Sequence, residues 1–96
     1  MISPVVQPLV RRAILDLMFD IGGEHNHETL TELLNSLGHR VARTDVAFEL
    51  GWLEQAGLVA CDHVAPFVIA RVLSDGRDVA QGRTKFVGVS PFKTGE

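Results

Sequence analysis

The sequence predicts an α+β fold in which three helices are followed by a two-stranded β-hairpin and a short last helix. Apolar residues recur at helical spacing in three successive segments before Leu58. After Leu58 the pattern changes to short runs rich in β-branched residues, which favour strands. Glycines follow each of the three helical segments, where a chain most easily leaves a helix. The 96 residues are enough for one domain with its own core.

The first helix is expected after an N-terminal lead of residues 1–7. It begins at Pro8, whose fixed φ angle suits a first turn, and ends at Ile21 before a glycine pair. Leu15 and Phe19 are four residues apart and widen the apolar surface beyond one stripe. Two interpretations remain open. The helix is central and contacted on several sides, or Leu15 and Phe19 form a protein interface with another subunit.

The second helix is expected from His27 to Leu37, with Asn26 as its N-cap. Its buried side consists of leucines at helical spacing, namely Leu30, Leu33, Leu34 and Leu37. Gly38 stops this helix, and a short turn leads to the next one. Two short helices joined by a glycine-containing turn form a helix-turn-helix arrangement.

The third helix is the segment around which the rest of the chain is organised. It begins near Ala42 or Thr44, of which Thr44 is the better N-cap, and it ends at Gly57. One side is a buried stripe of Val46, Leu50, Leu53 and Gly57. The opposite side presents Phe48, Gly51, Trp52 and Gln55. In a helix-turn-helix domain this helix would be the recognition helix.

The opposite side of the third helix conflicts with a DNA-recognition role. A helix that recognises bases normally presents Arg, Lys, Asn, Gln or Ser. This helix presents Phe48 and Trp52, four residues apart. They are flanked by three acidic residues, Asp45, Glu49 and Glu54. The aromatic pair is more typical of a protein-binding surface, or of packing under the hairpin.

After the third helix the sequence predicts a β-hairpin and a short last helix. The two strands cover residues 58–62 and 66–73, and residues 63–66 form the turn between them. Ser74 is expected to cap the last helix, which covers residues 75–81 and is closed by a glycine.

The predicted domain spans residues 8–82 and is followed by a tail of residues 83–96. Several apolar residues lie in this tail, namely Phe86, Val87, Val89 and Phe92. Loose tails rarely carry such residues, so we expect part of the tail to dock on its own chain or on a neighbouring one.

The order of three helices, hairpin and short helix resembles that of the winged-helix superfamily from about residue 10 to residue 82. The strongest local matches are LGWLEQAGLV, from Leu50 to Val59, and ARVLSDGRDVAQG, from Ala70 to Gly82. Both patterns are similar to those of MarR-like, PadR-like and ArsR-like regulators, which implies a dimeric, DNA-binding regulator of transcription. The longer pattern RRAILDLMFDIGGEHNHETLTELLNSLGHRVARTDV resembles small uncharacterised proteins of Mu-like transposable prophages. It implies a bacterial, prophage-borne protein and assigns no activity.

A DNA-binding interpretation uses polar residues before and along the third helix, namely Arg40, Arg43, Thr44 and Gln55. Arginines at a helix entrance can contact phosphates, and Arg11 and Arg12 would add to that surface. The hairpin has no Lys or Arg between Leu58 and Ala70 with which to grip DNA. With a net charge of −3, a monomer would bind duplex DNA weakly, whereas a homodimer would double the few arginines.

The alternative is a winged-helix adaptor that binds another protein and no DNA. Its surface would consist of Phe48, Trp52, Leu15 and Phe19. Large aromatic residues are favoured at binding hot spots. The partner would be a phage or host protein, or a second copy of the chain. The two interpretations differ in whether the aromatic side chains are covered within one chain.

Neither a metal site nor catalysis is expected. His25 and His27 are close and Cys61 lies elsewhere, but no C-x-x-C or H-x-x-x-H spacing occurs, so we expect no metal or other cofactor. We find no phosphate-binding glycine loop and no nucleophile with a His and acid partner, so we expect no enzyme. The single cysteine, the lack of a signal peptide and the lack of a long apolar run predict a cytoplasmic protein without a membrane partner.

Overall fold

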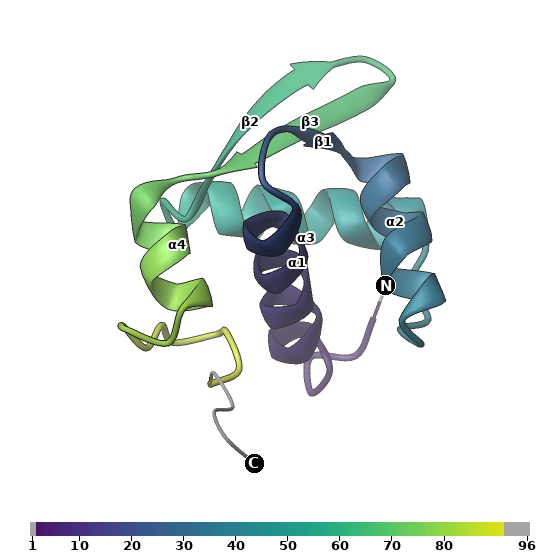
Figure 1. Ribbon diagram of the computed structural model, residues 1–96. Helices are drawn as coiled ribbons and strands as arrows, with labels where there is room; N and C mark the ends of the chain where they lie inside the picture. The colour runs from purple at the N-terminus through teal and green to yellow at the C-terminus, as the bar shows by residue number, and fades with distance from the viewer. Residues whose placement is uncertain (1, 92–96) are drawn as a thin grey trace.

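The computed structural model describes residues 2–91, which form four helices and a three-stranded antiparallel sheet (Figure 1). In chain order the elements are α1 (Gln7–Ile21), β1 (His25–Asn26), α2 (His27–Ser36), α3 (Arg43–Gln55), β2 (Val59–Val64), β3 (Phe67–Val72) and α4 (Ser74–Ala80). The fold class is therefore α+β, as predicted. Its order of elements is compatible with a winged-helix arrangement.

Helix α1 lies at the centre of the molecule and contacts each of the other three helices. In Figure 1 the β2–β3 hairpin lies above α3, and α4 and α2 lie on opposite sides of α1. These elements share one core, whose buried members include Ile14, Leu30, Leu50, Ala70 and Val79. The inner side of α3 is thereby packed against α1, α2 and β2.

Helix α3 ends at a glycine, as predicted. The backbone N–H of Gly57 donates to the carbonyl oxygen of Glu54 (3.0 Å), and that of Leu58 donates to Leu53 (3.0 Å). Gly57 has a φ angle of +79°, a left-handed conformation that glycine adopts without strain. Leu58 then enters the core, so the helix end also fixes where the hairpin begins.

The start of α3 differs from the prediction. Ala42, rather than Thr44, is the N-cap, and the helix begins at Arg43. The backbone N–H of Ala42 donates to Oδ2 of Asp45 (2.9 Å). The Asp45 carboxylate therefore accepts the hydrogen bond of the backbone N–H at the N-cap. Thr44 consequently lies in the first helical turn with its side chain exposed.

The sheet has one strand more than the sequence predicted. β1 pairs antiparallel with β3, with His25 opposite Ala70 and Asn26 opposite Ile69. A strand of two residues shows no alternation of apolar and polar side chains, so periodicity could not reveal it. The predicted hairpin is present, but β2 continues to Val64, and the turn is shorter than expected.

The two predicted side-chain caps have opposite outcomes. Asn26 caps α2, because its Oδ1 accepts a hydrogen bond from the backbone N–H of Thr29 (2.8 Å). Ser74 does not cap α4, because it is the first residue inside that helix. The N-cap position belongs to Leu73, which makes no side-chain hydrogen bond.

Candidate functional site on helix α3

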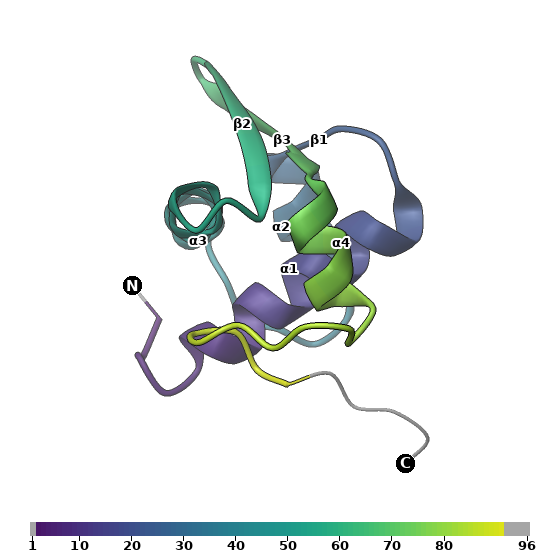
Figure 2. The same ribbon diagram turned by 90° about the vertical axis from the view of Figure 1, so that its left-hand side faces the viewer.

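One side of α3 is open along its length. Thr44, Phe48, Gly51 and Gln55 lie on one stripe of the helix, which we call the α3 face. Phe48 is 50% exposed, and Thr44 and Gln55 are also exposed. Figure 2 views α3 end-on at the edge of the molecule, and no other helix or strand lies outside it. On the opposite stripe Val46, Leu50 and Leu53 are fully buried, as predicted. Gly57, the fourth predicted member, lies after the end of the helix and is exposed.

Glu49 does not flank the α3 face, where the sequence analysis placed it. Its side chain is fully buried. One carboxylate oxygen accepts from Nε of Arg11 (2.6 Å), and the other accepts from Nε2 of Gln7 (2.8 Å). Glu49 follows Val46 by three residues and precedes Leu53 by four, so it points to the same side as these core residues. The prediction was wrong because it took the charge of Glu49 as a sign that its side chain is exposed to solvent.

The two other acidic residues of α3 are engaged beside the face. Asp45 accepts the hydrogen bond at the helix entrance described above. Glu54 lies on the side toward the hairpin, with Oε1 3.2 Å from Nε2 of His63. The α3 face itself therefore consists of uncharged residues.

Trp52 is partly buried within the chain rather than free for a partner. Its ring lies edge-to-face with Phe86 at a centroid distance of 6.0 Å. The guanidinium carbon of Arg11 lies 3.9 Å from the ring centroid, a cation–π contact. Gly88 packs so closely that a Cβ there would lie 2.6 Å from the ring. The predicted aromatic pair is thus divided, and Phe48 alone belongs to the open face.

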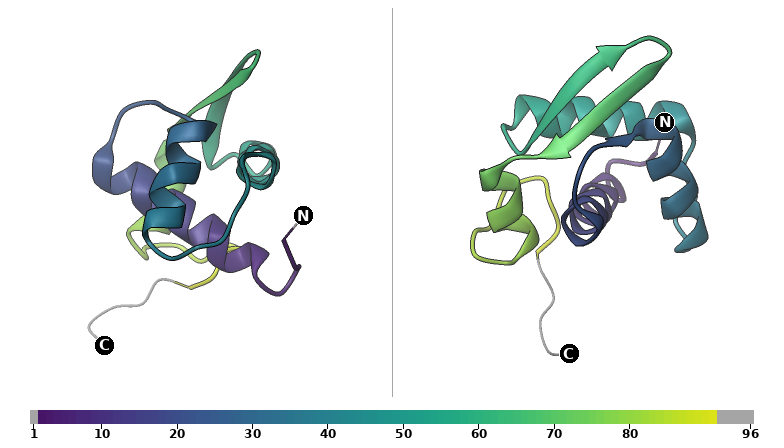
Figure 3. Two further views of the ribbon diagram at one scale, coloured as in Figure 1. Left: turned by 90° about the vertical axis from the view of Figure 1, so that its right-hand side faces the viewer. Right: turned by 45° about the horizontal axis from the view of Figure 1, so that its top comes forward.

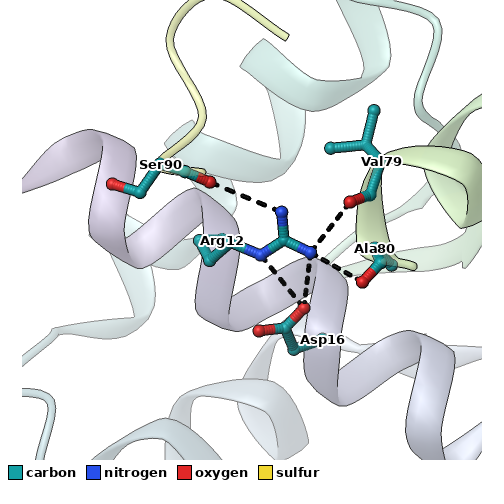
Figure 4. Close-up of polar contacts among 5 residues, drawn as sticks. All are labelled: Arg12, Asp16, Val79, Ala80 and Ser90. Atoms are coloured by element: carbon teal, nitrogen blue, oxygen red, sulfur yellow. Dashed lines mark hydrogen bonds and ion pairs between the residues drawn. The ribbon is translucent and has the colours of Figure 1, made fainter. Parts of the chain in front are cut away.

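Arg11 and Arg12 do not contribute to a surface for DNA, because both are buried. They are consecutive residues of the central helix and point in different directions. Arg11 extends toward α3, whereas Arg12 extends toward α4. Nη2 of Arg12 donates to the carbonyl oxygens of Val79 (2.9 Å) and Ala80 (2.7 Å) and to Asp16 (2.9 Å), as Figure 4 shows. Both arginines are structural.

The tail packs on its own chain over its described part, residues 83–91. Figure 2 shows it running from the end of α4 across α1. The carbonyl oxygen of Gly88 accepts from Nη1 of Arg11 (3.1 Å), and the backbone N–H of Ser90 donates to Pro8 (3.1 Å). Val89 is buried. The predicted docking of Phe92 lies outside the described residues.

Arg40 and Arg43 lie at the N-terminal end of the α3 face. Both side chains are exposed. Nη1 of Arg43 lies 2.6 Å from Oε2 of Glu28 in α2, and 66% of the Arg43 side chain remains exposed. Between Leu58 and Ala70 the hairpin has no Lys or Arg, and its His63 is paired with Glu54. Two exposed arginines are therefore the cationic groups at the entrance of this face.

Leu15 does not form an outward patch with Phe19. Leu15 is fully buried in the core, and Phe19 is partly buried against it. Of the two interpretations of the first helix, the structure supports the central helix that is contacted on several sides. Leu15 therefore has no exposed surface with which to contact another protein.

The histidines and the cysteine make separate contacts. Nδ1 of His27 accepts from the backbone N–H of Val68 (3.1 Å), which ties α2 to β3. Nε2 of His25 lies 2.7 Å from the carbonyl oxygen of Gly22. Burial, with smaller effects of Glu54 and Asp62, raises the pKa of Cys61 to about 11, so its thiol is protonated at neutral pH. Among residues 2–91 we find no group of three potential metal ligands.

Sequence comparison connects the chain to a bacteriophage. The uncharacterized protein gp26 of Escherichia phage Mu is 33% identical to it over 89 residues, which cover 93% of each chain. The chain belongs to the gp26 family. This membership confirms the predicted closeness to Mu-like phage proteins. No family model and no solved structure matches the chain.

Some residues of this gp26-family chain have roles that the sequence analysis missed. Arg11 and Gln7 hold Glu49, and Arg12 holds the end of α4. The available signal was position, because adjacent residues point about 100° apart around a helix, and a central helix is contacted on several sides. The helices within residues 2–91 include none that is long and apolar enough to cross a bilayer.

Proposed function

We propose that this gp26-family protein is a winged-helix DNA-binding protein that places the α3 face in the major groove and regulates transcription. The observation that supports this most is the open, uncharged α3 face with Arg40 and Arg43 at its entrance. Of the three acidic residues of α3, Glu49 is buried, and Asp45 and Glu54 are hydrogen-bonded beside the face. A cytoplasmic site of action, where DNA is accessible, is part of the proposal.

The arrangement of elements suits this role. Helices α2 and α3 form the helix-turn-helix pair, and the β2–β3 hairpin would be the wing. The two views in Figure 3 place α3 and the hairpin next to each other on the outside of the molecule. The major groove accommodates an α-helix, and phosphate contacts fix how deeply and in which register it lies.

The proposal predicts weak DNA binding with a shallow salt dependence. Each phosphate contact contributes a slope of about −0.9 to log K against log salt. Arg40 and Arg43 would therefore give a slope of about −2 for one protomer. We expect the Arg40→Ala/Arg43→Ala double variant to lose most of this slope and most of the affinity in a salt series with mixed-sequence duplex DNA, measured by fluorescence anisotropy.

A matched control separates this local effect from the loss of charge alone. Arg77→Ala/Arg83→Ala removes the same charge at exposed positions in and after α4. We expect this variant to bind DNA nearly as the unaltered protein does. No detectable binding at low salt, or an equal loss in both double variants, would contradict the proposed surface.

A homodimer is part of the proposal because two α3 faces would double the number of phosphate contacts. Val5, Val6 and Leu9 are exposed apolar side chains at the start of the molecule and are available for a second copy. A dimer that uses both faces would give a salt slope of about −4 instead of about −2. The same salt series therefore reports the number of faces engaged.

The second candidate function is a protein adaptor, which the exposure of Phe48 favours. A half-exposed aromatic ring on an uncharged helix face is suited to a pocket on a phage or host protein. Absence of DNA binding at low salt, together with binding to a protein that Phe48→Ala abolishes, would favour the adaptor.

A further inference from the structure

We propose that the α3 face recognises A·T base pairs, with Phe48 against a thymine methyl group and Gln55 on an adenine. This inference rests on the proposed DNA-binding function and adds the class of DNA site. It is based on the chemical groups that the open face presents and on those that it lacks.

Phe48 supplies an apolar contact at the middle of the face. Its ring is half exposed and takes part in no aromatic pair within the described residues. In the major groove the only apolar group on a base edge is the thymine methyl, and Phe is one of the side chains that contact it. Thr44 is one turn earlier on the same stripe and brings a second methyl group.

Gln55 supplies a paired donor and acceptor at the other end of the face. Its amide is exposed and makes no hydrogen bond within residues 2–91. A glutamine amide can bond to both N6 and N7 of adenine. Gln55 follows Phe48 by seven positions. This offset corresponds to about 10 Å along the helix axis, so the two side chains would contact different base pairs.

The face lacks the side chains that recognise guanine. Guanine is recognised mainly by Arg or Lys bonded to O6 and N7. None of the four residues of the α3 face is basic. Arg40 and Arg43 lie at the entrance, and Arg43 is also paired with Glu28. In this proposal both arginines contact phosphates rather than base edges.

Gly51 gives independent support for close approach by a partner. A Cβ at Gly51 would meet no atom within 4 Å, so packing within the chain does not require glycine. A glycine inside a helix costs about 1 kcal/mol relative to alanine. Without a side chain between Phe48 and Gln55, the helix backbone can lie nearer to the base edges.

The test compares three duplexes of equal length with alternating A·T, A·U or G·C pairs. Replacement of thymine by uracil removes only the methyl group. We expect the affinity for the A·T duplex to be about fivefold higher than for the A·U duplex. It should be higher than for the G·C duplex by a factor of about ten or more. Phe48→Ala should bring the ratio between A·T and A·U close to one, and Gly51→Leu should weaken binding to all three.

Leu37→Ala is the control, because Leu37 is 63% exposed, lies after α2 and is not a member of the α3 face. It should leave all ratios unchanged. Salt-dependent binding with equal affinity for the three duplexes, or a preference for G·C, would overturn A·T recognition and leave DNA binding intact. No binding to any duplex would overturn the proposed function as well.

Discussion

Replacing Glu49 by alanine is expected to lower the free energy of unfolding by about 3–5 kcal/mol, the usual cost of removing one partner from a buried ion pair. The substitution leaves the buried guanidinium of Arg11 without its carboxylate and removes the acceptor for Gln7. A domain of this size has about 5–15 kcal/mol of stability in total, so this variant would be close to unfolding. Urea denaturation followed by circular dichroism measures the change.

An exposed ion pair of the same length provides the comparison. Nη1 of Arg43 and Oε2 of Glu28 are also 2.6 Å apart, yet 66% of the Arg43 side chain and 38% of the Glu28 side chain are exposed to solvent. Removing Glu28 should therefore change stability by less than about 1 kcal/mol. The double variant Arg11→Met/Glu49→Leu should recover much of the loss, because two apolar residues can replace a buried pair. Equal effects at Glu28 and Glu49 would contradict the role of burial.

Replacing Arg12 by methionine is expected to lower the free energy of unfolding by about 2–4 kcal/mol. A hydrogen bond from a charged group stabilises the fold by about 1–3 kcal/mol, and a buried acceptor left without its donor costs about the same. Methionine keeps the apolar stem but cannot donate to the carbonyl oxygens of Val79 and Ala80 at the end of α4. The carbonyl oxygen of Ser90 in the tail also loses the hydrogen bond that Arg12 donates to it. Hydrogen exchange should accelerate at the amides of α4 and the tail.

Arg83 is the matched control for Arg12. Its side chain is 68% exposed and lies 3.6 Å from Asp78. We expect Arg83→Met to change stability by less than about 0.5 kcal/mol, as is usual for surface substitutions. If Arg12→Met had an equally small effect and left tail exchange unchanged, the arginine would not be holding α4 and the tail to α1.

The parts of the fold that sequence alone predicted are those fixed by local rules. Gly57 ends α3 because glycine adopts a left-handed backbone without strain, and Leu30 and Leu34 of α2 are buried as the helical repeat predicts. The prediction was wrong for Leu37, which lies after the end of α2 and is exposed. β1 was missed because two residues give no periodicity, and because its pairing with β3 joins positions far apart in the chain.

The candidate site was predicted less well, because charge was taken as a sign of exposure. Glu49 and Arg11 were both assigned to the surface, whereas they neutralise each other in the interior. Such a pair can be buried only when both members and their remaining hydrogen bonds are satisfied, which depends on three-dimensional contacts. Trp52 was assigned to the same side as Phe48, but Phe86 and Gly88 cover it from the tail.

These corrections make the candidate surface smaller and chemically simpler than the sequence indicated. Glu49 and Trp52 are removed from it, Asp45 and Glu54 lie beside it, and an uncharged face with two arginines at its entrance remains. Such a face has few phosphate contacts, so its affinity for DNA would depend strongly on base contacts and on the number of protomers.

The proposed function requires that the α3 face contacts duplex DNA. The most direct test is to titrate ¹⁵N-labelled protein with an A·T-rich duplex at low salt and to follow the backbone amide resonances. The largest changes should occur at Thr44, Phe48, Gly51 and Gln55, with little change in α4 or the described tail. An unchanged spectrum, or changes confined to the start of α1 and the tail while α3 is unaffected, would contradict the claim.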